Sequence, residues 1–252
     1  NMSAKPFALG VRIEHSQSMI NESQYGMKSH AKLAPASYKL TYTTTSGRGV
    51  YSFCMCPGGY VVNASSEDGL LAINGMSNYN RESENANSAI VVSVKPEDFG
   101  NNVLDGMAFQ RKLERLAFLE GNGNIPIQCY RDFKENKVTA KLGTVKPIFK
   151  GNYQFSNLNH ILPSFVSESL MEGIEYFGTK IKGYNDGDSI MAGIESRTSS
   201  PVRIERDETL ESNIKGIYPC GEGSGYAGGI TTAAMDGMKV AEVIASRYQK
   251  CL

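Results

Sequence analysis

The 252-residue sequence lacks an excess of charge of either sign, because 26 basic side chains balance 26 acidic ones. No broad electrostatic field therefore favours nucleic acid or an anionic membrane surface. No stretch approaches the roughly 18 uncharged apolar residues of a membrane span, and the N-terminal NMSAKPFALG lacks the apolar core of a signal peptide. We therefore expect a cytoplasmic protein without a nucleic-acid or membrane partner.

Cysteine and histidine are also scarce. Five cysteines, an odd number without framework spacing, fit a reducing compartment better than a disulfide-stapled secreted domain. His15, His30 and His160 are isolated from cysteine and carboxylate at metal-ligand spacing, so we predict no metal site and interpret each as structural or exposed. No nucleophile elbow is present, and the sequence identifies no catalytic acid or base.

Short β-like runs dominate the first two hundred residues. In SYKLTYTT, Leu40 and Tyr42 alternate with polar neighbours, which is the period of a strand with one wet face. Pro57 and the two glycines after it indicate a hairpin turn. The other runs, mostly bounded by Gly, Pro or Asn, lie at 7–14, 49–56, 60–65, 70–75, 87–94, 189–197 and 201–207. We predict a mixed or antiparallel sheet.

Two main helices interrupt these strands. Apolar residues recur at helical spacing over 104–121 and again over 162–183, with Asp105 and Gly121 suited to the ends of the first helix and Pro163 to the start of the second. Each apolar stripe is interpreted as a core face. The fold class predicted for 1–207 is therefore α+β, a β-rich domain with two main helices.

The stretch GEGSGYAGG, at 221–229, contains a literal G-x-G-x-x-G spacing. A predicted strand at 213–220 precedes it, and a helix follows, with Ala234, Met238, Ala241 and Ala245 on a small-residue face able to lie close against a sheet. Backbone amides and the helix dipole converge on an anion in such a loop. A dinucleotide fingerprint also needs a second parallel strand, and only 24 residues follow Gly228. The motif alone is therefore a poor guide to the role of the loop.

The position of the loop is explained better by its resemblance to the last strand, Gly-Glu turn and helix that close the FAD domain of two-domain flavoproteins. The resemblance implies that this segment faces a ribityl hydroxyl or a pyrophosphate oxygen, and that the first helical amides stabilise charge on a reduced ring. The cofactor-binding residues predicted in this way are Gly221, Glu222, Gly223, Gly228, Gly229 and Ile230.

The chain as a whole resembles the C-terminal half of bacterial FAD-dependent dehydrogenases, most of them without an assigned substrate. The resemblance is carried by KPFALGVRIEH, GRGVYSFCMCPGG, NGMSNYNRESENANSAIVV, ESRTSSPVRI and YPCGEGSGYAGGITTAAMDG. It implies a substrate domain at 1–207. It also implies, at 208–252, the closing strand, loop and helix of a Rossmann-like FAD-binding domain whose N-terminal part is absent. The chain is thus expected to be a fragment whose partner is that missing region, inactive and free of FAD by itself.

Three further features keep two interpretations each. The turn RTSSPVR, with Arg197, Thr198, Ser199, Ser200 and Arg203, either faces a substrate carboxylate or the flavin edge, or simply builds the turn before Pro201. The stretch NYNRESENANS, at 78–88, either lines a polar pocket or is a solvated connection. Cys54, Cys56 and Cys220 are interpreted as packing residues rather than redox groups, with the first two on one strand face.

Two classes of function are compatible with these patterns. The first is a part of an FAD-dependent oxidoreductase that acts on a small organic substrate. The second is a non-catalytic β-rich module that binds a ligand or a protein, with the glycine loop as a packed strand-to-helix turn. An anion-sized space at the amides of the loop would favour the first class.

Overall fold

The computed structural model describes residues 1–248, and the backbone forms two compact units. The sheet unit consists of Leu9–Ser93 and Arg111–Ser196. The terminal unit consists of Asn1–Ala8, Val94–Gln110 and the chain from Arg197 onward. The predicted closing segment begins at 208, whereas the terminal unit also takes in residues from the start and the middle of the chain. The division at 207 into a substrate domain and a closing segment stays a prediction, and residues 249–252 of that segment lie outside the described part.

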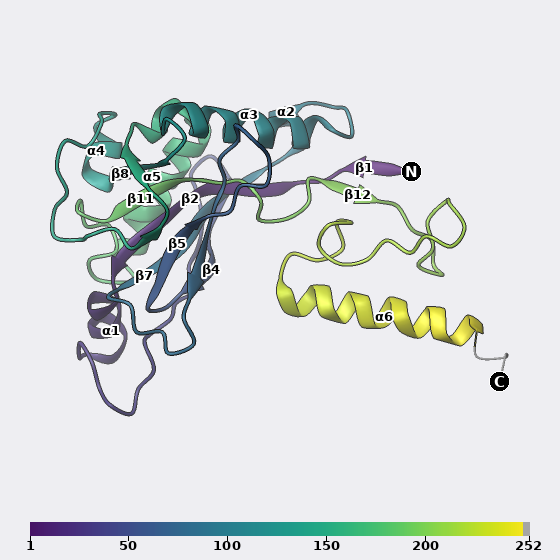
Figure 1. The fold of residues 1–252 in the computed structure, drawn as a ribbon, viewed down its shortest axis with the longest axis horizontal. Helices are drawn as coiled ribbons and strands as arrows, with labels where there is room; N and C mark the ends of the chain where they lie inside the picture. Colours follow the sequence, from purple (N-terminus) through teal and green to yellow (C-terminus); the bar gives the residue numbers. More distant parts are fainter. Residues whose placement is uncertain (249–252) are drawn as a thin grey trace. The chain divides into compact units, whose positions relative to one another are not determined.

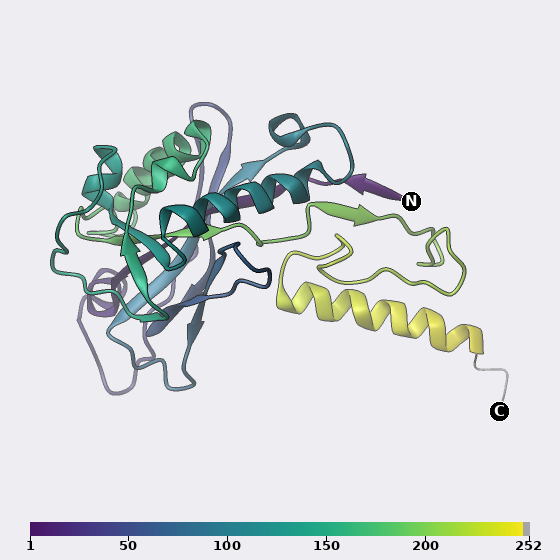
Figure 2. The same ribbon diagram turned by 45° about the horizontal axis from the view of Figure 1, so that its top comes forward.

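A seven-stranded mixed sheet is the centre of the sheet unit (Figure 1). Its long inner strands are β2 (Phe7–Ser16) and β7 (Asn85–Val94), which lie side by side in both ribbon views (Figure 2). On one side of this pair are β4 (Gly49–Cys56) and the edge strand β3 (Thr41–Thr43). On the other side are β11 (Ile190–Glu195), β8 (Ile125–Cys129) and β10 (Tyr153–Phe155). β8 and β10 pair in parallel. The prediction of an α+β fold with a mixed sheet is confirmed.

Close backbone approach explains why β2 and β7 occupy the middle. A Cβ at Gly10 would overlap the carbonyl oxygen of Ile90, so only glycine lets the two strands come together there. Leu9, Val11 and Ile13 have no exposed surface. A strand buried on both faces is apolar along most of its length, as these two are.

A smaller sheet contains β6 (Ile73–Ser77), β5 (Gly59–Asn63) and β9 (Phe149–Lys150). The turn predicted at Pro57 and Gly58 is present, but the predicted hairpin is wrong. β4 pairs with β7 and β3, whereas β5 pairs with β6 and β9, so the turn passes the chain from one sheet to the other. A break in the register of β4 between Phe53 and Cys56, where Cys54 has φ 46°, bends the strand away before the turn.

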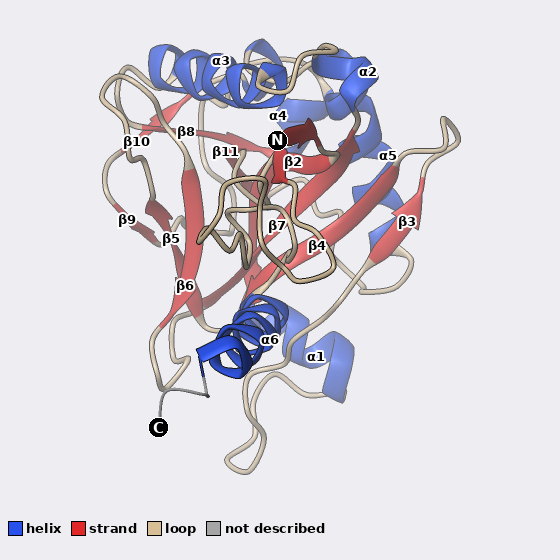
Figure 3. Ribbon diagram, turned by 90° about the vertical axis from the view of Figure 1, so that its right-hand side faces the viewer, coloured by secondary structure: helices blue, strands red, loops and turns tan. Residues whose placement is uncertain are grey.

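Helix α5 (Ser164–Gly178) packs on the strands β4 and β3, as Figure 3 shows. A Cβ at Gly173 would lie 2.6 Å from the Val50 side chain, so the helix approaches the sheet closely at this glycine. Val166, Leu170, Ile174 and Phe177 are buried along one stripe, which confirms the predicted core face. The helix ends at Gly178, five residues before the predicted end. The sheet unit also holds α1 (Gln17–Tyr25), the part of α3 (Asp105–Glu120) from Arg111 onward, α4 (Tyr130–Lys134) and the 3-10 turn η1 (Leu158–His160).

The terminal unit has a two-stranded antiparallel ladder of β1 (Met2–Ala4) and β12 (Val202–Ile204). It also holds α2 (Pro96–Phe99), the start of α3 (Asp105–Glu120) and α6 (Ile230–Tyr248). The rings of Phe7, Phe99 and Phe109 form its aromatic cluster, with centroids 5.4 Å and 6.3 Å apart.

The strand predicted at 213–220 is absent from the structure of residues 1–248. Its backbone is irregular, with a turn in which the Ile217 amide donates to the Ile214 carbonyl. A strand needs a ladder partner, and none of the described strands pairs with this segment. Of the predicted Rossmann-like strand, loop and helix, residues 1–248 therefore contain only the loop and the helix.

Glu14, on β2, is a buried carboxyl group that should make the stability of the chain depend on pH. The side chain is fully buried, one carboxyl oxygen has no hydrogen-bond partner, and burial raises the pKa of the carboxyl from 4.5 to about 8. Between these pH values the unfolded chain releases a proton that the folded chain retains, so the free energy of unfolding falls as the pH rises.

We expect Glu14→Gln to remove this fall in the free energy of unfolding at higher pH. Urea unfolding at pH 5 should show little difference from the wild-type chain, whereas at pH 8 the variant should be more stable by up to roughly 5 kcal/mol, since one unit of pKa is about 1.4 kcal/mol. The exposed Glu22→Gln is the control and should change stability equally at both pH values. An equal effect of Glu14→Gln at both pH values would contradict the assignment.

Candidate functional site

The glycine loop is shaped by hydrogen bonds within the terminal unit. The Gly225 amide donates to the Glu222 carbonyl over 2.9 Å, and the Tyr226 amide donates to the Gly221 carbonyl over 3.1 Å. Gly225 has φ +86°, and a Cβ there would lie 2.6 Å from the Val202 carbonyl oxygen, so this position requires glycine. These contacts fix the loop against β12.

Arg206 and Asp236 connect the loop to α6. The guanidinium donates to both Asp236 oxygens over 2.7 Å and 3.0 Å, and to the Pro219 carbonyl over 2.8 Å. It also lies 3.6 Å from the centroid of the Tyr226 ring. Asp236 in turn accepts the Gly221 amide over 2.9 Å, and the Arg206 hydrogen bond holds the pKa of this carboxyl below its ordinary value. Both side chains are nearly buried, so the pair is a well-defined support of the loop.

The remaining predicted cofactor residues face outward. A Cβ at Gly223 or Gly228 would meet nothing within 4 Å, and one at Gly229 would meet only the Thr232 hydroxyl at 3.9 Å. Ile230 is 90% exposed. Gly229 caps α6 by accepting the Ala233 amide, and in residues 1–248 the backbone amides at 230–232 have no acceptor. The six predicted residues thus separate into Gly221 and Glu222, whose backbone builds the loop, and four that border open space.

The RTSSPVR turn is divided in a similar way. Thr198 is buried and donates to the Ala8 carbonyl over 2.6 Å, and Ser200 bonds the Val202 backbone, as the turn-building interpretation predicts. Ser199 accepts from the Lys5 ammonium over 3.4 Å. Arg197 and Arg203 are exposed, and Arg203 donates to the Gly225 carbonyl.

Lys5 is a cation that the sequence did not indicate. Partial burial and, after it, the charge of Arg203 lower the pKa of the Lys5 ammonium, while Glu222 opposes this shift. Lys5, Arg203, Glu222 and the free amides of α6 all belong to the terminal unit, so the charges beside the loop include two cations and one carboxylate.

A second polar site lies in the sheet unit around Arg12. The guanidinium forms a two-armed ion pair with Glu195, with both nitrogen-oxygen distances at 2.7 Å. It also donates to Asn87 over 2.9 Å, to Asn74 over 3.2 Å and to the Cys54 carbonyl over 3.0 Å. Arg12 is fully buried and Glu195 is 4% exposed. Four of the five stretches that carry the family resemblance therefore meet at one buried arginine. The sequence held one signal that could have indicated this pair, because Arg12 and Glu195 are charged residues inside predicted apolar strands.

The cysteines beside Arg12 contradict the packing interpretation. Cys54 is exposed and Cys56 is partly exposed, because the irregular register of β4 turns this end of the strand outward. The Cys56 thiol lies 3.9 Å from Arg12, and burial raises its pKa, so it is not an activated thiolate. Cys220 is also exposed, since the predicted strand that would have buried it does not form.

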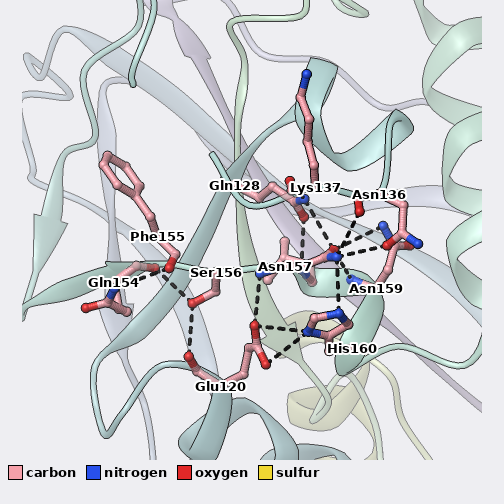
Figure 4. Close-up of polar contacts among 11 residues, drawn as sticks. Glu120, Gln128, Asn136, Lys137, Gln154, Phe155, Ser156, Asn157, Asn159 and His160 are labelled. Atoms are coloured by element: carbon pink, nitrogen blue, oxygen red, sulfur yellow. Dashed lines mark hydrogen bonds and ion pairs between the residues drawn. The ribbon is translucent and has the colours of Figure 1, made fainter. Parts of the chain in front are cut away.

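His160 belongs to a polar network centred on Asn157 (Figure 4). Its Nδ1 lies 3.3 Å from both carboxyl oxygens of Glu120, and its Nε2 lies 3.3 Å from the Asn157 amide nitrogen. The Asn157 amide must donate to Nε2, so Nδ1 carries the ring proton. Both nitrogens are occupied, which agrees with the predicted structural role. His15 is buried with its ring centroid 4.3 Å from that of Tyr184 at a tilted angle, and burial lowers the pKa of His15 to about 4.

The polar stretch at 78–88 contributes to a surface hollow. Residues 77–81 and 31–35 line a space of about 800 Å³, with Tyr79 fully exposed at its side. Asn85 and Asn87 instead lie buried in β7. One end of the stretch thus fits the pocket interpretation, and the other end is part of the core.

Within residues 1–248, no group of three or more His, Cys, Asp or Glu side chains is placed to hold a metal ion. No helix in the same range has the length and apolar character needed to cross a bilayer.

Comparison with known proteins places the sheet unit in a family. Residues 6–198 match the model of the family described as FAD-dependent protein, C-terminal domain-like, and the chain belongs to this family. The chain is also 54% identical, over 254 aligned positions, to an uncharacterized protein of Clostridium beijerinckii. The alignment covers 98% of the chain and 48% of that protein, so the chain spans about half the length of the relative it matches. The glycine loop at 221–229 lies beyond residues 6–198, which the family model matches.

The Arg12–Glu195 pair can be tested by unfolding. Arg12→Met leaves a buried carboxylate without its cation and should lower the free energy of unfolding by about 3–5 kcal/mol. The double variant Arg12→Met, Glu195→Leu removes both charges and should recover part of this loss. Arg111→Met is the control, because its ion pair with Glu67 is 3.0 Å long but exposed, and should cost less than about 1 kcal/mol. A double variant as unstable as Arg12→Met would contradict the proposed electrostatic cost.

Proposed function

We propose that this chain is part of an FAD-dependent oxidoreductase that acts on a small organic substrate. The family carries the FAD dependence, and the sheet unit that it matches is proposed as the substrate domain. The observation that carries the proposal for the terminal unit is the outward face of the glycine loop, where Gly223 and Gly228 border open space beside three free helical amides.

The chemistry of this face fits a flavin nucleotide. Free amides at the start of a 19-residue helix attract a phosphate oxygen or a negatively charged ring, and glycines without a Cβ let a ligand approach the backbone. We propose that Gly223, Gly228, Gly229 and Ile230 contact the ribityl and ring side of FAD, while Gly221 and Glu222 hold the loop in shape. Bound FAD supplies the hydride or electron transfer of such enzymes.

In this proposal, some residues of the terminal unit support the loop and others contact the cofactor or the substrate. Arg206 and Asp236 hold the loop, and the α6 amides stabilise negative charge at the cofactor edge. Arg197, Ser199 and Arg203 are the side chains of the RTSSPVR turn proposed to meet a substrate carboxylate or the flavin edge, whereas Thr198 and Ser200 build the turn.

Helix α6 supports the proposal of a missing partner region. Ala234, Met238, Ala241 and Ala245, the face predicted to lie against a sheet, are all exposed, and Met238 is 64% exposed. The relative of the chain is about twice as long. We propose that the polypeptide beyond this chain in the whole protein covers this face and supplies the adenosine side of the FAD site.

A non-catalytic binding module is the second candidate function. The hollow of about 800 Å³ beside residues 77–81 favours it, because this hollow belongs to the sheet unit and needs no flavin. Flavin content distinguishes the two functions, because only the oxidoreductase requires bound FAD.

Gly228→Val in the whole protein tests the loop. The chain itself has room for the side chain, so the melting temperature without flavin should not change, whereas bound FAD per protein should fall strongly because valine fills the ligand side. Gly225→Ala is the contrasting variant and should lower stability, because its Cβ meets the Val202 carbonyl. Unchanged flavin content in Gly228→Val would show that the loop does not contact the cofactor.

The chain expressed alone is expected to be colourless. FAD should be retained only when the rest of the polypeptide is co-expressed, since the proposed site is shared between them. Flavin absorbance after purification is the measurement. Met238→Asp should prevent this recovery by placing a charge on the covered face of α6, whereas Glu242→Gln, on the same helix, should not. A stoichiometric yellow chain by itself would overturn the proposal of a shared site.

A further inference from the structure

The surface hollow of about 800 Å³ in the sheet unit has a cation on each of its two walls. One wall consists of residues 31–35, and the other consists of residues 77–81, which begin at the last residue of β6. Lys32 belongs to the first wall and Arg81 to the second, and both are exposed. The volume falls in the range of roughly 300–1,000 Å³ typical of small-molecule pockets. The hollow therefore has room for an organic ligand between two accessible cations.

No carboxylate balances these cations in the part of the chain that the structure describes. The lining contains no aspartate or glutamate, and neither Lys32 nor Arg81 forms an ion pair. Residues 23–66 contain no acidic side chain, so the first wall has none near it in the sequence. Glu82 follows Arg81, but it lies outside the lining and accepts from the Asn80 amide over 3.4 Å. The hollow therefore favours an anion.

A buried glutamine ties the two walls together. The Gln17 side-chain nitrogen donates to the Ala36 carbonyl over 3.0 Å, directly after the first wall, and the side-chain oxygen accepts the Gly58 amide over 2.7 Å. A Cβ at Gly58 would overlap the Arg81 carbonyl oxygen, so the second wall packs directly on this glycine. Because both walls are held by contacts within the chain, a ligand does not have to assemble them, which lowers the cost of binding.

The lining also offers apolar surface to the body of a ligand. Tyr79 is fully exposed, and Leu33 is 45% exposed. Ala31, Ala34 and Pro35 add further apolar groups to the first wall. An exposed phenol ring can pack against a second aromatic ring, and such ring pairs are favourable beyond the area that they bury. The hollow thus combines two cations with an apolar surface that includes one free ring.

We propose that this hollow binds a phosphate monoester with an aromatic body. Such a group carries about −1.5 to −2 charges at pH 7, which matches two cations better than a single carboxylate does. The phosphate oxygens accept from the Lys32 ammonium and from the Arg81 guanidinium, whose planar fork suits phosphate. The ring packs against Tyr79 and Leu33. The proposal rests on the hollow that favours the second candidate function, and none of its residues belongs to the glycine loop.

Phenyl phosphate is a suitable probe, since it joins a phosphate monoester to one aromatic ring. In the 252-residue chain labelled on its leucine methyl groups, NMR titration should shift the Leu33 signals saturably in the millimolar range. An ionic strength of about 0.15 M screens distant charges. The fully buried Leu9 is the internal control and should not shift. Benzoate, with one charge, should bind at least about threefold more weakly, and neutral phenol and cationic phenethylamine should not bind.

Variants that remove one cation locate the phosphate contacts. Lys32→Gln and Arg81→Asn should each weaken the binding of phenyl phosphate by about three- to fivefold. Asparagine suits position 81, because its backbone has φ 52° and asparagine adopts this left-handed conformation readily. Lys39→Gln and Arg115→Gln are matched controls that remove exposed cations outside the lining, and they should bind as the wild-type chain does.

Tyr79→Ala tests the aromatic contact separately. The side chain is fully exposed, so the melting temperature should not change. The variant should bind phenyl phosphate about threefold more weakly, because the ring pair is lost, and should bind inorganic phosphate as the wild-type chain does. An equal loss for both anions would contradict the placement of the ring.

The proposal is overturned if phenyl phosphate gives no saturable shift at Leu33, or if benzoate, phenol or phenethylamine binds as well as phenyl phosphate does. It is also overturned if Lys32→Gln and Arg81→Asn bind like their controls. The titration of the unaltered chain decides the matter even where a variant folds poorly. Preferred binding of another probe overturns the phosphate assignment but not the second candidate function. Flavin content enters none of these measurements, so failure here is distinguishable from failure of the oxidoreductase function.

Discussion

The buried pair of Arg12 and Glu195 is the constraint on which the sheet unit depends. Removing two charges from water is costly, and only close geometry with further hydrogen bonds offsets that cost. Here the guanidinium is satisfied by β11, by Asn74 and Asn87 from β6 and β7, and by the backbone at the end of β4. A slip of one residue in β2 would turn Arg12 to the opposite face of the sheet. The pair therefore fixes register between segments that are far apart in the sequence.

The sequence predicted most strands and the main helices because their signals are local. Alternation, turn residues and helical spacing located β4, β7 and the core face of α5 within a few residues. β8 was missed, although Ile125–Cys129 is wholly buried, because IPIQC is too short to show a period. The strand at 213–220 was predicted from composition, but a strand also needs a neighbour, which no local pattern supplies. The exposed cysteines follow from the register break in β4, another long-range property.

The candidate sites show the same limit. The glycine spacing located the loop, and the RTSSPVR stretch located a turn, but neither pattern distinguishes an amide used within the loop from one left free. That distinction depends on Asp236, fifteen residues after Gly221, and on Arg206 before the loop. The Arg12 cluster was missed because its members are spread from β2 to β11.

In the terminal unit, the glycine loop is fully formed, whereas one face of α6 is exposed. The loop is closed by contacts of this chain alone, since Arg206, Asp236 and Tyr226 hold it without a ligand. Among residues 1–248, no strand pairs with the segment before the loop, and Ala234, Met238, Ala241 and Ala245 on α6 are exposed. Both gaps are of the kind that a sheet fills, one through backbone pairing and the other through close packing. Because the loop is already formed within residues 1–248, a ligand that meets it does not have to reorganise the backbone, which lowers the free-energy cost of binding.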